Sequence, residues 1–91
     1  MSQRISFIVT GKVQGVGFRM FTKSRANELG LTGFVENAAH GGVEGEAQGP
    51  SDKIQTLIDA LQQGPRGSRV DKLEQNDRDL HEGERSFVVR H

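Results

Sequence analysis

The sequence predicts an α+β fold in which two helices cover one face of an antiparallel sheet. Strand-like and helix-like segments follow the order βαββαβ, and a short extra strand follows near the C-terminus. Two segments carry apolar residues at helical spacing, and such stripes must be buried against another layer. Most other apolar residues alternate with polar ones, as in strands with one buried face. Because βαβ connections are right-handed, this order favours the ferredoxin-like sandwich.

The first strand and the first helix are predicted over residues 5–10 and 18–29. In the strand, every second residue is apolar and large, namely Ile5, Phe7 and Val9. In the helix, residues that suit a buried face recur at helical spacing, namely Phe18, Phe21, Thr22, Ala26 and Leu29. Gly30 follows and is a suitable C-terminal cap, because glycine adopts the left-handed conformation there without strain.

A hairpin is predicted after the first helix. Residues 31–37 are rich in β-branched and aromatic side chains and indicate a strand. The segment 37–42 contains Asn, His and two Gly residues, which is typical of a hairpin loop. In the third strand Val43, Gly45 and Ala47 alternate with polar residues, among them Glu44 and Glu46, which we expect to face solvent.

The C-terminal half predicts a second helix and two strands. Pro50 and Asp52 suit the first turn of a helix, and Gly64-Pro65 ends it. Its apolar stripe consists of Ile54, Leu57, Ile58 and Leu61. Residues 69–75 indicate a weaker strand in which a bulge would explain the broken alternation. We expect an exposed loop over residues 76–84 and a short last strand over residues 86–90.

Composition limits the classes of function. The 91 residues suffice for one small domain, and 12 basic residues balance 12 acidic ones. A neutral chain does not favour non-specific binding of nucleic acid, which usually requires a basic excess. The chain has no cysteine, which excludes disulfides, thiol catalysis and thiolate ligands. We expect a cytoplasmic protein without a membrane partner, because no apolar run approaches the length of a membrane span.

A glycine-rich turn joins the first strand to the first helix, with the sequence Gly11-Lys12-Val13-Gln14-Gly15-Val16-Gly17-Phe18-Arg19. Glycine tolerates the unusual backbone angles that let consecutive N–H groups point toward an anion. The N-terminus of the following helix and the forked guanidinium of Arg19 also favour phosphate oxygens. The turn lacks the patterns of the common nucleotide-binding loops. A tight connection with a surface arginine is the alternative interpretation.

This turn resembles the first signature of the acylphosphatase family, Gly-x-Val-Gln-Gly-Val-x-Phe/Tyr-Arg. A second segment, Gly33-Phe34-Val35-Glu36-Asn37 with Gly41, Val43 and Gly49 after it, resembles the family's other signature. The resemblance covers residues 4–90 and implies the same ferredoxin-like fold, with residues 1–91 forming a single acylphosphatase-like domain. Departures from the family pattern at Glu36, His40 and His91 leave Arg19 and Asn37 in place.

The resemblance implies an enzyme that hydrolyses the carboxyl–phosphate bond of acyl phosphates, giving a carboxylate and inorganic phosphate. It implies Arg19 and Asn37 as the catalytic residues, with Asn37 orienting the attacking water. Without the resemblance, Asn37 is more typical of a turn residue than of a catalytic one. The implied phosphate-binding residues are Gln14, Gly15, Val16, Gly17, Phe18 and Arg19. The carboxylate is a good leaving group, so no general acid is required. No metal and no cofactor are implied, because one arginine and the backbone N–H groups already offset the phosphoryl charge.

Two other functions are compatible with the sequence. One is a carbamoyl-phosphate-handling domain, as in hydrogenase-maturation proteins, although those modules belong to much longer chains. The other is a non-catalytic anion- or RNA-binding module, because Gly33-Phe34-Val35 overlaps an RNA-binding motif of this fold. The histidines, at positions 40, 81 and 91, do not have the spacing of a metal site. We expect a monomer that acts on a small-molecule acyl phosphate, with no nucleic-acid partner.

Overall fold

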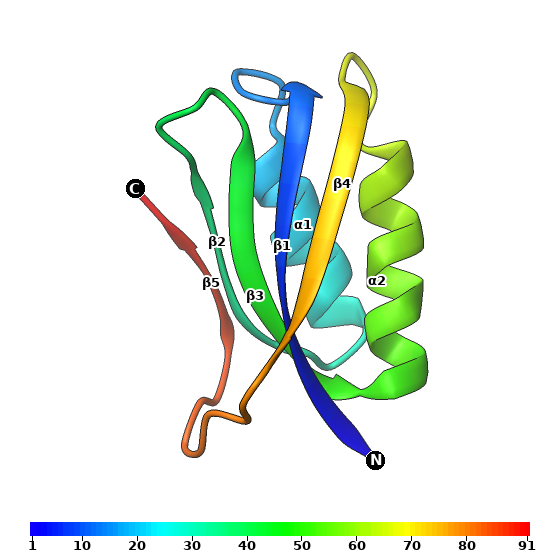
Figure 1. Cartoon of the computed structure of the whole chain (residues 1–91), viewed down its shortest axis with the longest axis vertical. Coiled ribbons are helices and arrows are strands. Elements are labelled where there is room, and N and C mark those ends of the chain that lie inside the picture. The colour runs from blue at the N-terminus through cyan, green and yellow to red at the C-terminus, as the bar shows by residue number, and fades with distance from the viewer.

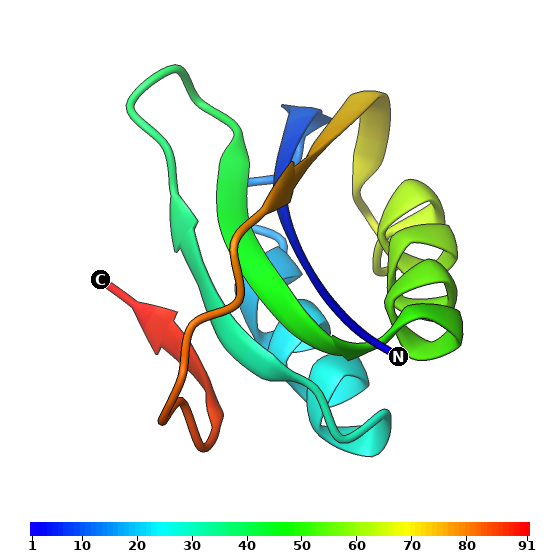
Figure 2. The same cartoon turned by 60° about the horizontal axis from the view of Figure 1, so that its bottom comes forward.

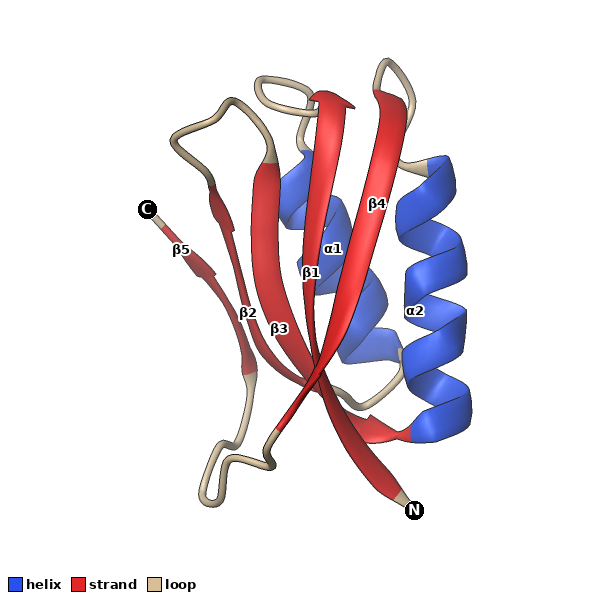
Figure 3. Ribbon diagram, viewed as in Figure 1, coloured by secondary structure: helices blue, strands red, loops and turns tan.

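The structure of the chain, a computed structural model that describes residues 1–91, contains one five-stranded sheet and two helices (Figure 1). In chain order the elements are β1 (Ser2–Lys12), α1 (Phe18–Glu28), β2 (Thr32–Asn37), β3 (Val43–Pro50), α2 (Ser51–Gln63), β4 (Arg69–Arg78) and β5 (Phe87–Arg90). The strand order is β4-β1-β3-β2-β5, and both helices lie on the same face of the sheet (Figure 3). This arrangement confirms the predicted sandwich. Neither helix is long and apolar enough to cross a membrane.

The C-terminal part of the sheet extends beyond the prediction. β4 continues to Arg78, because Asn76, Asp77 and Arg78 pair with β1 instead of belonging to the expected loop over residues 76–84. β4 is an edge strand with exposed side chains on both faces, so its hydrophobic pattern does not mark where it ends. The strands β1 to β4 pair antiparallel with their neighbours. In contrast, β5 pairs parallel with β2, from Gly33–Phe87 to Glu36–Arg90.

The broken alternation in residues 69–75 corresponds to a β-bulge. Thr10 pairs with Lys72 and Gly11 pairs with Val70, which leaves Asp71 as the extra residue. Gly11 has a φ of 131°, and a Cβ atom there would run into the carbonyl oxygen of Arg69. This close approach requires glycine at the end of β1, directly before the glycine-rich turn.

The core lies between the helices and the sheet, two layers that Figure 2 shows from a second direction. The predicted stripe of α2 is buried there, with Ile54, Leu57, Ile58 and Leu61. From the predicted stripe of α1, Phe18, Thr22 and Ala26 are buried, whereas Phe21 and Leu29 are partly buried against the core. They pack against the alternating apolar residues of β1, which are Ile5, Phe7 and Val9. Phe87 of β5 joins the same core, so the short edge strand is anchored by an aromatic side chain.

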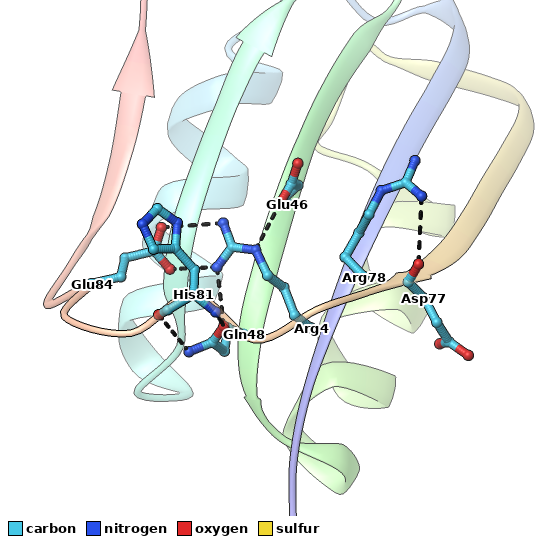
Figure 4. Close-up of polar contacts among 7 residues, drawn as sticks. All are labelled: Arg4, Glu46, Gln48, Asp77, Arg78, His81 and Glu84. Atoms are coloured by element: carbon cyan, nitrogen blue, oxygen red, sulfur yellow. Dashed lines mark hydrogen bonds and ion pairs between the residues drawn. The ribbon is translucent and has the colours of Figure 1, made fainter.

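An arginine is buried on the other face of the sheet, under the connection from β4 to β5 (Figure 4). The side chain of Arg4 is only 3% exposed; its Nε donates to Oε1 of Glu46 at 2.7 Å, and its Nη1 donates to Oε1 of Glu84 at 2.8 Å. Gln48 accepts a further hydrogen bond from Arg4 and donates one to the carbonyl oxygen of His81. This polar cluster ties the β4–β5 connection to β1 and β3.

The pairing of Glu84 with Arg4 makes the stability of the fold sensitive to acid. Burial by itself raises the pKa of Glu84, but hydrogen bonds from Arg4 and Thr32 and the charge of Arg4 lower the pKa below its ordinary value of 4.5. A carboxylate of this kind stabilises the fold above its unfolded pKa, and this stabilisation disappears as the pH falls through its folded pKa. We therefore expect Glu84→Gln to lower the free energy of unfolding by about 1–3 kcal/mol near neutral pH.

Urea denaturation at pH about 7 and about 3 measures this effect. The difference in the free energy of unfolding between Glu84→Gln and wild type should be smaller at the lower pH. Glu82→Gln is the matched control, because Glu82 is an exposed carboxylate in the same connection. It should change the free energy of unfolding little at either pH. An equal loss for Glu84→Gln at both pH values would show that the charge of Glu84 is not what stabilises the cluster.

Candidate functional site

Of the residues 11–19 predicted to form the glycine-rich turn, residues 13–17 do so, because Gly11 and Lys12 end β1 and Phe18 and Arg19 begin α1. Gly15 and Gly17 both have a φ of 75°, a left-handed conformation that favours glycine. Gly17 caps α1 without a side-chain hydrogen bond. The first backbone bond of the helix runs from the N–H of Phe21 to the carbonyl oxygen of Gly17, so the N–H groups of residues 18–20 have no intrahelical acceptor. The turn therefore presents free donors and the positive end of the helix dipole.

Arg19 lies in the first turn of α1 and is half-buried. Its Nη1 donates a hydrogen bond to the carbonyl oxygen of Arg90 at 3.0 Å and lies 3.3 Å from Nδ1 of His91. The first turn of α1 contains no acidic residue to offset this charge. A cation beside the positive end of a helix is unfavourable on its own, and an anion bound between them would relieve the repulsion. The Nε and Nη2 groups of Arg19, which make no hydrogen bond within the protein, can bind such an anion.

Asn37 is brought to the same place by the hairpin of β2 and β3. It is the last residue of β2, pairs with Val43 and is exposed. Figure 1 shows the glycine-rich turn and the β2–β3 loop at the same end of the sheet. A cleft of about 120 Å³ between them is lined by Val13, Gly15, Gly17, Phe18, Arg19, Met20 and Asn37. The two predicted catalytic residues, 18 positions apart in the sequence, thus contribute to one cleft.

Four of the six predicted phosphate-binding residues line this cleft, and the other two lie outside its lining. Gly15, Gly17, Phe18 and Arg19 line the cleft, whereas Val16 packs against the hydrophobic core. The side chain of Gln14 is directed toward the β2–β3 loop, where its Nε2 donates hydrogen bonds to the carbonyl oxygens of Ala38 and Gly42. Lys12 also lies outside the cleft, since it is exposed at the end of β1 opposite Arg69.

Several residues of the site were not predicted from the sequence. Val13 is buried beneath the cleft, and Met20 lines it with a side chain that is 58% exposed. The position of Met20, directly after Arg19 in the first helical turn, is a signal that sequence analysis could have used. The carbonyl oxygen of Arg90 is different, because it reaches Arg19 only through the parallel pairing of β5 with β2.

The donor groups of the cleft suit an anion. They are backbone N–H groups, one guanidinium and one carboxamide, and no carboxylate lines the cleft. The chain has no cluster of three or more potential metal-ligating side chains. His40 lies in the β2–β3 loop, where its Nδ1 accepts a hydrogen bond from the N–H of Gly42 at 3.1 Å. The arrangement can therefore bind a phosphoryl group and place one polar side chain beside it.

The open face of the sheet carries side chains of both charges, unlike the cleft. A second hollow there, of about 200 Å³, includes Ile8, Phe34, Glu44 and Glu46 in its lining. Phe34 is covered by the guanidinium of Arg90, 3.7 Å from the ring centroid. Glu44 and Glu46, which we expected to face solvent, are half-buried, and Glu46 forms an ion pair with Arg4. Carboxylates beside the Phe34 ring, which Arg90 already covers, do not suit a polyanion such as RNA.

Comparisons with known proteins agree with this geometry. A family model described as Acylphosphatase matches residues 5–89. A curated protein named Acylphosphatase, from Salinibacter ruber, is 44% identical over 88 residues, which are 97% of this chain and 93% of that protein. Another, from Bifidobacterium longum, is 48% identical over 96% of this chain and 91% of that protein.

A solved structure gives the same result. The crystal structure of acylphosphatase from Bacillus subtilis superposes with a TM-score of 0.93, at 34% sequence identity, over 100% of both chains. The similarity thus includes the whole sheet, both helices and the turn between β1 and α1.

Proposed function

The chain belongs to the acylphosphatase family and hydrolyses acyl phosphates, and we propose that Arg19, Asn37 and the glycine-rich turn carry out this reaction. The observation that carries the proposal is the single cleft at the N-terminus of α1, to which the turn, Arg19 and Asn37 all contribute. The substrate is a small-molecule acyl phosphate. Its phosphoryl group is an anion of the kind that a helix N-terminus and an arginine bind together.

In this proposal the turn and Arg19 bind the phosphoryl oxygens. The donors are the backbone N–H groups of residues 14–19 and the free edge of the Arg19 guanidinium. Arg90 fixes the other edge of that guanidinium through its carbonyl oxygen. Donors that are already in place stabilise charge in the transition state without reorganising during the reaction.

Asn37 positions the water that attacks phosphorus. Its carboxamide oxygen accepts a hydrogen bond from the water and so holds the water in line with phosphorus. The water oxygen forms the new bond to phosphorus, and the bond between phosphorus and the carboxyl oxygen breaks, with its electron pair leaving on the carboxylate. A phosphoryl oxygen accepts the proton of the water, so the products are a carboxylate and inorganic phosphate.

The same residues make a metal or a general acid unnecessary. Phosphoryl transfer has a loose transition state that depends mainly on positioning and on electrostatic stabilisation. The leaving carboxylate needs no proton to depart. We therefore propose a metal-independent reaction that uses no cofactor. We also propose that residues 1–91 form one domain and that the protein acts as a cytoplasmic monomer.

The other functions considered from the sequence are not favoured. RNA binding would use the open sheet face, where Glu36 and Glu44 lie near Phe34. A carbamoyl-phosphate-handling role is not favoured by the relatives either, because they match along nearly their whole length and are named for acylphosphatase. Release of inorganic phosphate from a small acyl phosphate, measured in the presence of a chelator, tests the proposed reaction directly.

Inorganic phosphate and sulfate are expected to inhibit competitively and to stabilise the fold. Both ions present the tetrahedral oxygens that the turn and Arg19 would bind. A ligand present at 100 times its dissociation constant raises the free energy of unfolding by about 2.7 kcal/mol. Initial rates and thermal unfolding midpoints measured with either ion, and with sodium chloride of equal ionic strength as the control, check this prediction.

Nuclear magnetic resonance locates the same binding event. Phosphate should shift the backbone amide signals of residues 14–19 most, with Asn37 next. Single-stranded RNA should leave unchanged the signals of Ile8 and Phe34, which line the hollow on the open sheet face. The proposed function would be wrong if micromolar RNA shifted the signals of these two residues while phosphate left the turn unaffected.

A further inference from the structure

We propose that the side chain of Gln14 is a positioning residue that holds Asn37 at a fixed place relative to the phosphate-binding turn. Gln14 lies in the turn, but its carboxamide is bonded to the β2–β3 loop, which begins directly after Asn37. The inference rests on the proposed roles of the turn and Asn37. It gives the side chain of Gln14 a role separate from phosphate binding by its backbone N–H.

The contact consists of two hydrogen bonds from one nitrogen atom. Nε2 of Gln14 lies 3.0 Å from the carbonyl oxygen of Ala38 and 2.9 Å from that of Gly42. These acceptors are 24 and 28 residues away in the sequence. Both hydrogens of the carboxamide are therefore used, and the group has no donor left for a phosphoryl oxygen.

The loop that receives these bonds is closed on itself. The N–H of Ala38 donates to the carbonyl oxygen of Gly42 at 2.8 Å, and the N–H of Gly41 donates to the carbonyl oxygen of Ala38 at 3.1 Å. Gln14 donates a second hydrogen bond to each of these two carbonyl oxygens. It thus binds the two ends of a small closed loop, of which one end is joined covalently to Asn37.

No other side-chain hydrogen bond joins residues 13–17 to residues 38–42. Without Gln14, the relative position of turn and loop would depend on backbone pairing and on apolar contacts alone. A displacement of about 1 Å between the water and the phosphorus atom can reduce the rate by up to about 10²-fold. Gln14 therefore acts on catalysis through the geometry of Asn37, without touching the substrate through its side chain.

A double-mutant cycle tests this inference. Gln14→Met keeps the length of the side chain and removes both donors. In the wild-type background we expect kcat to fall by about tenfold, with inhibition by phosphate changed less than about threefold. In the Asn37→Ala background the same substitution should change kcat by less than about twofold, because the residue it positions is already absent.

Gln55→Met is the matched control, since Gln55 also donates a side-chain hydrogen bond but does so on the exposed face of α2. It should leave kcat unchanged in both backgrounds. Should Gln14→Met fail to fold, Gln14→Asn enters the same cycle, because it keeps the carboxamide but is one methylene too short to reach both carbonyl oxygens.

A second readout does not depend on activity. In the phosphate-free protein, Gln14→Met should shift the side-chain amide signals of Asn37 and the backbone signals of residues 38–42. An equal fall of kcat in both backgrounds, or a loss of phosphate inhibition as large as the loss of kcat, would overturn the inference. If Asn37→Ala by itself left kcat unchanged, the proposed function of Asn37 would fail first, and the cycle separates the two results.

Discussion

Arg19→Ala is expected to reduce turnover below measurable levels while the protein stays folded. The substitution removes the only cationic side chain that lines the cleft. A single well-placed donor to a developing charge contributes about 10²–10³-fold to the rate, and a permanently charged one contributes more. The fold should survive because Arg19 is half-exposed and its contacts are with Arg90 and His91 at the end of the chain. Steady-state kinetics and circular dichroism on the same preparation measure both expectations.

Arg25→Ala provides the control for this experiment. Arg25 is an arginine of the same helix, half-exposed in the last turn, where it pairs with Glu28. Its removal should leave kcat close to the wild-type value. Turnover of Arg19→Ala within about tenfold of wild type would reject the assignment of Arg19, since a charged donor to the transferring group should contribute more than this.

Arg19→Lys should restore little of the lost activity. Lysine supplies the charge but has a single ammonium group, which cannot bond to Arg90 on one edge and to two phosphoryl oxygens on the other. The hydrogen bond to the carbonyl oxygen of Arg90, at 3.0 Å, fixes the orientation of the planar guanidinium of Arg19. The same bond would not orient the ammonium group of lysine. Comparable rates for Arg19→Lys and wild type would mean that charge alone is needed.

The fold could be predicted where each element carries its own pattern. The apolar stripe of α2 and the alternating apolar residues of β1 are both buried, as their periodicity indicates. In β4 the pattern fails only at the end of the strand, because residues 76–78 are exposed in an edge strand and resemble a polar loop. Arg4 is also indistinguishable in sequence from a surface arginine, and its burial depends on the connection from β4 to β5, which brings Glu84 over the sheet.

The candidate site also has a part that could be predicted from the sequence and a part that could not. Gly15, Gly17 and Arg19 lie within five residues of one another, so a short motif suffices to predict that they come together at the start of α1. Asn37 joins them through the antiparallel pairing of β2 and β3, which the hairpin pattern anticipates. The contacts of Arg19 with β5 and of Gln14 with the β2–β3 loop depend on exact tertiary placement. A parallel pair of strands, in particular, has no local turn to reveal its register.

Asn37→Ala is expected to reduce kcat by about 10²-fold or more while phosphate affinity changes little. Asn37 belongs to the β2–β3 hairpin and lies apart from the backbone donors of the turn. Its removal therefore leaves the proposed phosphate site intact and removes the group that orients the water. Steady-state kinetics and the inhibition constant of phosphate separate these two quantities.

Asn27→Ala on the exposed surface of α1 is the control for Asn37→Ala, and it should change neither kcat nor phosphate inhibition. An Asn37→Ala variant with normal kcat but weakened inhibition by phosphate would assign Asn37 to binding instead. The division of roles follows from the architecture. Arg19 and the turn belong to the β1–α1 unit, whereas Asn37 belongs to the β2–β3 hairpin, so the group proposed to orient water and the groups proposed to bind phosphate lie on different supersecondary units. The rate of the reaction then depends on how firmly these two units are joined, which is the role that the structure gives to Gln14.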